Sequence, residues 1–258
     1  MRLKFCIIGA GNLATHLAVE LHRKAGEVIQ LYSRTETSAR KLADKIDCAY
    51  TTSVTQITPD ADIYFTALKD SAVAEVLGRV NLKNKLIVHT SGSLPLSVLK
   101  NFSKNYGVFY PLQTFSKSRE VDFREIPLFV EANNPTNEQR LTQLARQISG
   151  KVFVLDSSKR KSLHIAAVFA CNFVNHFYAL AGDYLEAQNI PFDVLRPLVA
   201  ETAGKVQELS PNEAQTGPAV RFDENIIGDH LKALEAFPEM KTLYNSISKS
   251  IFEHHQKK

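Results

Sequence analysis

A glycine-rich turn directly after an apolar run near the N-terminus constrains the fold of this chain more than any other feature. Residues 5–8 read Phe-Cys-Ile-Ile, and Gly9, Gly11 and Ala14 follow in the pattern Gly-x-Gly-x-x-Ala. Gly9 permits a tight turn, Gly11 lets the backbone approach a pyrophosphate, and Ala14 lets the next helix lie close to the strand. The free N–H groups at the start of that helix would point at the phosphates. The predicted contacts with a dinucleotide come from Gly9, Gly11, Asn12 and Leu13.

The surroundings of the turn strengthen this prediction. A helical pattern spans residues 13–24 and a second apolar run spans residues 27–33. Strand, glycine turn, helix and strand thus follow one another within about 30 residues, which is a complete βαβ unit. Such a unit is the context that the glycine pattern requires. The alternative is a ligand-free unit in which the two glycines serve close packing alone.

The residues at the end of the second strand indicate which dinucleotide binds. Sites for NAD usually carry an acid there, which accepts hydrogen bonds from the ribose 2′-hydroxyl. This chain has Ser33, Arg34 and Thr35 instead, and the first acid is Glu36. A guanidinium with neighbouring hydroxyls suits a 2′-phosphate, so the predicted cofactor is NADP rather than NAD, FAD or S-adenosylmethionine. The alternative for Arg34 is a solvated loop residue.

The composition is that of an ordinary globular protein, with 44% hydrophobic and 22% charged residues over 258 positions. This length predicts two domains. The net charge of +4 is spread thinly, which gives little support for a nucleic-acid surface. No apolar run approaches the ~20 residues of a membrane span and the cysteines lie far apart, so we expect a cytoplasmic protein. No spacing of His, Cys, Asp or Glu indicates a metal site.

Strand and helix patterns alternate up to residue 156 and then cease to alternate. Further strands are expected at 61–68, 85–90, 107–110, 127–131 and 151–155, with helices at 36–46, 70–79, 96–104 and 136–149. This alternation predicts an α/β fold, with a doubly wound Rossmann domain over residues 1–156. Residues 157–258 are expected to form an all-helical domain. Its predicted helices span 161–188, 192–209, 223–237 and 238–255, with a polar loop at 210–221.

Four motifs carry a resemblance to a known family. They are Gly-x-Gly-Asn-Leu-Ala at 9–14, Val-His-Thr-Ser-Gly-Ser-Leu at 88–94, Tyr-Pro-Leu-Gln-Thr-Phe-Ser at 110–116 and Thr-Gly-Pro-Ala-Val-Arg-Phe-Asp at 216–223. The chain resembles the Rossmann-like NADP oxidoreductases with a C-terminal domain of unknown function, and more distantly pyrroline-5-carboxylate reductase. The resemblance implies an NADP domain and a helical domain like that of 6-phosphogluconate dehydrogenase, often used for dimerisation. This sequence departs from the pattern at Tyr110, where relatives often carry His, and at Phe222, where they often carry Gly.

Turns at the carboxyl ends of the strands are expected to share one rim, because ligands of open α/β sheets bind there. By the resemblance, the turn that begins at Leu68 runs beside the adenosine and pyrophosphate, and the turn at 90–92 runs beside the nicotinamide. Ser91 and Gly92 are therefore candidate cofactor residues, and Ser91 can bond the carboxamide or the substrate. The alternative is that residues 91–93 form a loop and a helix N-cap.

The long helix expected at 161–188 carries a polar stripe on an otherwise apolar surface. Lys161, His164 and Asn172 fall within about 80° of one another at 100° per residue. The stripe continues with Asn175, His176 and Asp183. Hydride transfer to C=O or C=N needs an acid that protonates the heteroatom and donors that polarise it. We expect His164 or Lys161 as the acid and Asn172 as its orienter; the alternative is a solvated face or a dimer interface.

The motif at 216–223 supplies one further candidate, Arg221. Its guanidinium can clamp a substrate carboxylate or phosphate, or it can pair with an acid such as Asp223. Together these features predict an NADP-dependent reductase or dehydrogenase of a small polar, anionic substrate, bound in a cleft between the domains. We also expect a homodimer through the C-terminal domain, and no nucleic-acid, membrane or metal partner. The rival is a non-catalytic NADP-binding sensor, which would not need His164 and Asn172 beside the nicotinamide.

Overall fold

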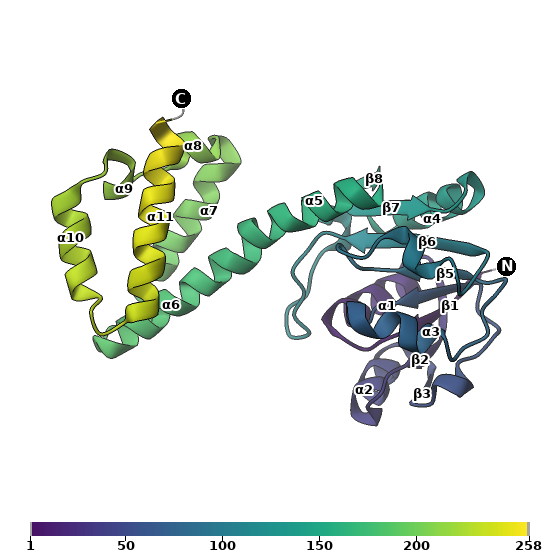
Figure 1. Ribbon diagram of the computed structural model, residues 1–258. Coiled ribbons are helices and arrows are strands. Elements are labelled where there is room, and N and C mark those ends of the chain that lie inside the picture. Colours follow the sequence, from purple (N-terminus) through teal and green to yellow (C-terminus); the bar gives the residue numbers. More distant parts are fainter. Residues whose placement is uncertain (1, 257–258) are drawn as a thin grey trace. The chain divides into compact units, whose positions relative to one another are not determined.

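The computed structural model describes residues 2–256. The chain divides into two compact units, Met1–Asn172 and Phe173–Lys258. The described strands all belong to the first unit, and the second unit is built from helices (Figure 1). The predicted fold class, a Rossmann-type α/β domain followed by a helical region, is thereby confirmed.

One sheet of eight strands forms the centre of the first unit. Its strands are β1 (Leu3–Ile8), β2 (Gly26–Tyr32), β3 (Ala49–Thr51), β4 (Ile63–Thr66), β5 (Leu86–His89), β6 (Asn105–Pro111), β7 (Leu128–Ala132) and β8 (Val152–Val154). The spatial order is β3-β2-β1-β4-β5-β6-β7-β8. Neighbouring strands are parallel except for β6 and β7. Because the chain winds in opposite directions from β1, the switch point that binds ligands in such sheets lies between β1 and β4.

Helices cover both faces of the sheet and bury its apolar side chains. The longer ones are α1 (Asn12–Lys24), α2 (Glu36–Ile46) and α4 (Pro135–Ile148), and α3 (Val73–Leu77) is short. Successive side chains of a strand point to opposite faces. In β1, Phe5 and Ile7 accordingly pack with α1, α2 and α4, whereas Cys6 and Ile8 pack with α3. Burial raises the pKa of the Cys6 thiol to about 12, which fits a packing role for this cysteine.

Two predicted helices are shorter than expected. The helix expected at 96–104 is a single 3₁₀ turn, η3 (Leu96–Leu99), and the one expected at 70–79 consists of η2 (Asp70–Ala72) followed by α3. The Oγ of Ser103 donates to the backbone carbonyls of Lys83 and Lys85, at 3.2 and 2.5 Å. These bonds return the chain to the sheet before a longer helix can form. The short, largely exposed strand β3 has no apolar pattern and was not predicted.

The second unit consists of α6 (Val174–Ala187), α7 (Arg196–Glu208), α8 (Pro211–Ala214), α9 (Pro218–Arg221), α10 (Glu224–Ala233) and α11 (Pro238–Gln256), with the 3₁₀ turn η6 (Phe192–Leu195) before α7. The prediction of a polar loop at 210–221 was wrong, because α8 and α9 lie there. Proline in the first turn begins both helices, and Ser210 and Glu213 form a capping box for α8. Phe222 ends α9 at φ 51°, in the left-handed region, which explains why glycine suits this position.

A continuous helix over Ser157–Ala187 spans the division between the two units. It consists of α5 (Ser157–Ala167), a π-helical segment at Val168–Phe173, and α6. The two units divide between Asn172 and Phe173, within the π-helical segment, and the boundary at residue 156 stays a prediction. This helix is long and apolar enough to cross a membrane by length and composition alone, a test that helices of soluble proteins also pass.

Candidate cofactor and substrate site

The glycine turn after β1 has the geometry of a phosphate cradle. Gly9 lies at φ +129°, and a Cβ atom there would be 2.3 Å from the carbonyl oxygen of Ala67, so only glycine fits. Gly11 is the N-cap of α1 and makes no side-chain cap, and a Cβ atom on it would meet nothing within 4 Å. Open space therefore lies at the N-terminus of a 13-residue helix without acids in its first turn. A pyrophosphate needs this arrangement, and the residues present fit it.

Arg34 is exposed directly after β2 and forms no ion pair within residues 2–256. The Ser33 N–H donates to the Thr51 carbonyl at 3.2 Å, which fixes the chain before it. Glu36 accepts a hydrogen bond from the Tyr50 hydroxyl at 3.3 Å. An unpaired guanidinium therefore stands between two hydroxyl-bearing residues at the end of β2, which suits a 2′-phosphate.

The loop after β6, which carries the end of the motif at 110–116, lies against the first turns of α1. The Asn12 side chain donates to the Phe115 carbonyl at 2.8 Å, and the His16 ring nitrogen lies 2.9 Å from the Ser116 carbonyl. The rings of His16 and Phe115 also pack, with centroids 5.4 Å apart. The Asn12 side chain thus holds this loop, which leaves its backbone N–H as the group suited to a phosphate. Leu13 is half-buried and packs against the core.

The turn after β5 is held by its own side chains. The Ser91 Oγ donates to Asp70 at 3.0 Å and accepts from the N–H groups of Ser93 and Leu94 at 3.0 and 3.1 Å. These bonds are the loop that one interpretation of Ser91 expects, although η3 has Pro95 rather than a serine at its N-cap, and the cofactor role of Ser91 stays a prediction. Leu68, in the turn after β4, is half-buried against the core.

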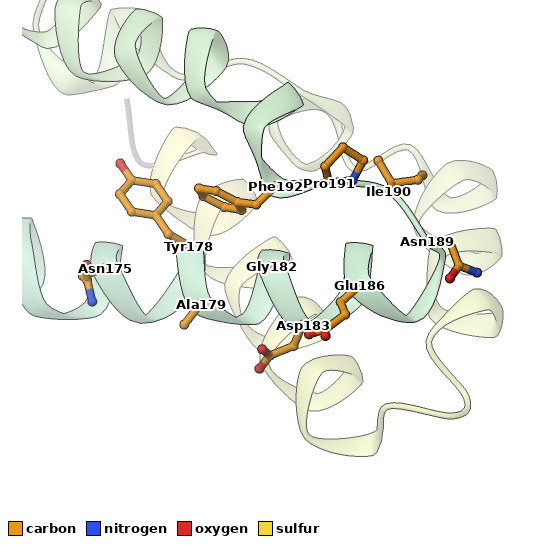
Figure 2. Close-up of a pocket in the computed structure, with 10 residues that line it drawn as sticks. All are labelled: Asn175, Tyr178, Ala179, Gly182, Asp183, Glu186, Asn189, Ile190, Pro191 and Phe192. Atoms are coloured by element: carbon orange, nitrogen blue, oxygen red, sulfur yellow. The ribbon is translucent and has the colours of Figure 1, made fainter.

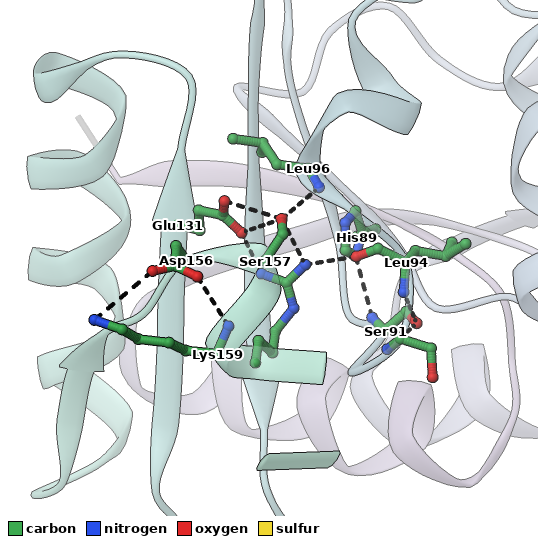
Figure 3. A network of polar contacts seen from close by, with 10 residues as sticks. His89, Ser91, Leu94, Leu96, Glu131, Asp156, Ser157 and Lys159 are labelled. Atoms are coloured by element: carbon green, nitrogen blue, oxygen red, sulfur yellow. Dashed lines mark hydrogen bonds and ion pairs between the residues drawn. The ribbon is translucent and has the colours of Figure 1, made fainter. Parts of the chain in front are cut away.

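His89, the last residue of β5, binds the backbone of the same turn. It is fully buried, and its Nδ1 accepts the Ser91 N–H at 3.2 Å (Figure 3). Burial, and secondarily the charge of Arg160, lowers the pKa of His89 to about 3. The ring is therefore neutral at pH 7, with its proton on Nε2, and a weak backbone hydrogen bond at Pro95 offsets part of the lowering of its pKa.

His164 and Tyr110 lie in contact with each other beside Gly92, and both line a pocket of about 590 Å³. The Tyr110 hydroxyl lies 3.0 Å from His164 Nδ1. A Cβ atom on Gly92 would lie 2.6 Å from that same nitrogen and 2.9 Å from the Tyr110 ring, so glycine lets the three groups meet. The other residues lining the pocket are Leu112, Gln113, Thr114, Leu163, Ala166, Ala167, Ala170, Cys171 and Asn172. The structure thus joins two predicted site residues, His164 and Asn172, with a third, Gly92, at one edge.

The rest of the predicted stripe does not continue into this pocket. Lys161 is exposed and does not line it. Asn175 and Asp183 line a different pocket of about 840 Å³, where Tyr178 of α6 projects on the side of the helix on which Phe192 of η6 lies (Figure 2). The π-helical segment between His164 and Asn175 widens the helical turn, so a constant 100° per residue does not hold across it.

Arg221 lies at the exposed end of α9 in the second unit. It forms no ion pair within residues 2–256, and Asp223 instead caps α10 by accepting the Ile226 N–H at 3.3 Å. The alternative that Arg221 pairs with Asp223 is therefore not observed. No cluster of three or more metal-binding side chains occurs among the described residues.

A buried polar network beside the pocket was missed by the sequence analysis. Arg160 is completely buried and forms an ion pair with Glu131 of β7. Its guanidinium also donates to the Leu94 carbonyl at 2.5 Å and to the Ser157 Oγ at 3.2 Å (Figure 3). The Ser157 Oγ donates to Glu131 and accepts the Leu96 N–H at 2.9 Å. In the sequence, Arg160 stands in the basic run Lys159-Arg160-Lys161. Such a run is typical of a solvated surface and gives no sign that the middle residue is buried.

Comparison with known proteins agrees with these observations. Residues 4–92 match the model of the family described as NADP oxidoreductase coenzyme F420-dependent, and residues 126–251 match a domain of unknown function, DUF2520. A protein from Bacteroides fragilis, proposed to be an NADP oxidoreductase, is 52% identical over 98% of both chains, with a TM-score of 0.94. This chain belongs to the same family of NADP oxidoreductases. No protein of curated function matches it.

Two more distant structures share the fold of this NADP oxidoreductase. A pyrroline-5-carboxylate reductase from Streptococcus pyogenes is 14% identical and has a TM-score of 0.63, with 97% of this chain and 98% of that chain covered. An imine reductase from Myxococcus stipitatus, solved in complex with NADP⁺, is 15% identical and has a TM-score of 0.65, with 98% and 93% covered. The predicted family and its distant likeness to pyrroline-5-carboxylate reductase are confirmed, and membership of an oxidoreductase family implies a small-molecule substrate.

Proposed function

We propose that this NADP oxidoreductase uses NADP to transfer hydride to or from a small polar, anionic substrate in the cytoplasm. The contact between His164 and Gly92 is the observation that carries the proposal. It brings the predicted acid against the turn that the family resemblance assigns to the nicotinamide, at the edge of the pocket of about 590 Å³. A sensor that merely binds NADP would have no need of a titratable side chain there.

The pocket supplies the proton that hydride transfer requires. When bound, the nicotinamide supplies or accepts the hydride, and the heteroatom of the substrate exchanges a proton with the protein. Burial raises the pKa of Tyr110, so its phenol stays protonated and donates to Nδ1 of His164. This bond describes the ring after it has given up a proton. In the imidazolium that acts as the acid, Nδ1–H donates to the Tyr110 oxygen instead, and the proton passed to the substrate is the one on Nε2, the nitrogen away from Tyr110. His164 is therefore the proposed acid, with Tyr110 fixing its ring and the Asn172 amide polarising the substrate.

Two cations were expected to take part in binding or catalysis. We propose Arg221 as the clamp for the anionic group of the substrate, because its guanidinium is exposed and forms no ion pair with any of the described residues 2–256. Lys161 is the second choice for the acid, since it is exposed and does not line the pocket with His164.

We further propose a homodimer through the helical unit. Val194 on η6 and Leu198 on α7 are 58% and 61% exposed. These two exposed apolar side chains lie close together in the sequence, and we propose that they pack against a second copy of the chain. Homodimer interfaces are richer in apolar residues than the remaining surface. Analytical ultracentrifugation should show a dimer that Leu198→Glu dissociates; a wild-type monomer would contradict this.

The first test is calorimetric titration with NADPH and NADH. We expect NADPH to bind more tightly, and Arg34→Ala to weaken NADPH binding by roughly 1–3 kcal/mol through loss of charge-assisted hydrogen bonds. NADH binding should be unaffected. The control is Arg40→Ala, which removes an exposed arginine of the neighbouring helix α2. If neither nucleotide binds, the proposal is wrong.

The second test separates catalysis from sensing. With a substrate found by screening oxo acids and imines against NADPH, His164→Gln should lower turnover about 100-fold, as loss of a general acid does, without changing NADPH affinity. Unchanged turnover in this variant would remove His164 from the mechanism. Tight NADPH binding without turnover of any such compound would favour the sensor.

A further inference from the structure

The buried pair of Arg160 and Glu131 joins three elements that have no backbone ladder in common. Glu131 lies on β7, Arg160 is in the second turn of α5, and the Leu94 carbonyl that Arg160 binds belongs to the loop after β5. Ser157, in the first turn of α5, bonds both Glu131 and the Leu96 N–H. The loop at 91–96 is thus held at two points by side chains of one helix end.

The same helix carries the proposed acid one turn later. Residues four apart lie on one face of a helix, so Arg160 and His164 face the same loop. Arg160 holds the loop at the Leu94 carbonyl, while His164 contacts it at Gly92. Leu94 lies only two positions after Gly92, so a bond that fixes the Leu94 carbonyl also restricts where Gly92 lies relative to His164.

Stability alone is a weak reason for such a buried pair. Desolvation of two charges offsets most of their attraction, and apolar replacements are often neutral for stability. This loop, however, lacks regular secondary structure between Ser91 and Pro95, so side chains have to fix it. A fork of planar donors can hold a carboxylate and a carbonyl at once, which a lysine cannot do in the same way.

We infer that Arg160, paired with Glu131, is a positioning residue that fixes the loop at 91–96 against α5 and so sets where Gly92 meets His164. This inference rests on the proposed function in one respect: it assumes that His164 and the loop work together in the reaction. The contacts of Arg160 themselves are independent of any nucleotide.

The test compares variants of the full chain without nucleotide, by hydrogen exchange and by the reaction of His164 with diethyl pyrocarbonate, mapped by mass spectrometry. Arg160→Met combined with Glu131→Gln leaves no buried charge. We expect amide exchange in 91–96 to accelerate about tenfold and His164 to react several-fold faster, while β1 and β4 stay protected. Lys159→Met, which removes an exposed cation from the same helix turn, is the control and should change neither.

Arg160→Lys tests the same role in a second variant, so the outcome does not depend on whether the double variant folds. The lysine keeps a cation beside Glu131 but lacks the second guanidinium nitrogen that donates to the Leu94 carbonyl. Amide hydrogen exchange should therefore accelerate in 91–96, while the strands of the sheet stay protected. Unchanged exchange and unchanged His164 reactivity in a folded variant would overturn the inference, as would full turnover with NADPH despite a loosened loop. A wild type that binds no NADPH would refute the proposed function and would leave the exchange result as a separate observation.

Discussion

The glycine turn after β1 and the pocket at His164 are built in different ways. The turn is made of backbone: Gly9 at φ +129° and Gly11 with open space around it belong to one short stretch of chain. The pocket is made of side chains from distant segments, since Tyr110 and His164 come from β6 and α5. A site made of local backbone leaves a short motif in the sequence, whereas a site made of distant side chains leaves scattered residues. Substitutions in the turn and in the pocket should therefore have different consequences.

The largest expected effect separates the two glycines of the turn. Gly9→Ala places Cβ 2.3 Å from the backbone oxygen of Ala67 at a positive φ, so we expect a loss of roughly 3–5 kcal/mol in the free energy of unfolding. Gly11→Ala meets nothing within 4 Å and should leave the stability nearly unchanged while weakening NADPH binding. Urea unfolding and calorimetry measure both. Equal stability losses would contradict a cofactor role for the space at Gly11.

The next effect concerns His89, which supports the loop of the pocket. Its folded-state pKa of about 3 lies below its ordinary value of 6.5. Between these values the unfolded chain binds a proton that the folded chain does not, so stability present above pH 6.5 is lost as the pH falls. The slope from this group approaches about 1.4 kcal/mol per pH unit. His89→Asn, whose oxygen can still accept the Ser91 N–H, should flatten the stability curve from pH 6.5 to 4; an unchanged curve would contradict this account.

Gly92→Ala tests the pocket itself. The new Cβ would overlap His164 Nδ1 at 2.6 Å and the Tyr110 ring at 2.9 Å, so the imidazole and the phenol that it contacts both have to shift. We therefore expect turnover to fall about tenfold or more, because small displacements of a catalytic group are costly, and stability to fall by about 1 kcal/mol. Gly228→Ala, at a helical glycine with open space, is the control. A variant with wild-type turnover would separate Gly92 from the chemistry.

The same contrast explains what the sequence could predict. The glycine turn, the strands β1, β2, β4 and β5, and the family followed from local patterns that one segment carries by itself. His164 and Asn172 were predicted from helical periodicity, and both line the pocket, although Asn172 lies within the π-helical segment. The same segment made the prediction fail for Asn175 and Asp183.

Other features could not be predicted because the signal lies in tertiary contacts. Arg160 looks like a surface cation in the basic run 159–161, and only the position of Glu131 on β7 reveals that it is buried. The antiparallel pairing of β6 and β7 depends on which strands become neighbours in the sheet. The helix expected at 96–104 had a suitable pattern, but bonds from Ser103 to the preceding loop end it early. Long-range contacts outweighed local preference in each case.

The smallest expected effect is at Phe222, where a strained backbone and a packed side chain occur in the same residue. Its left-handed conformation, φ 51°, favours glycine, while its ring packs on Phe252 with centroids 4.9 Å apart. Phe222→Ala loses the ring and keeps the strained backbone, whereas Phe222→Gly loses the ring and relieves it. We expect both variants to be less stable than the wild type, and the glycine variant to be about 1 kcal/mol more stable than the alanine variant. Thermal unfolding measures the difference. If alanine proves the more stable of the two, the backbone at this position is unstrained, and the phenylalanine is there for its contacts alone.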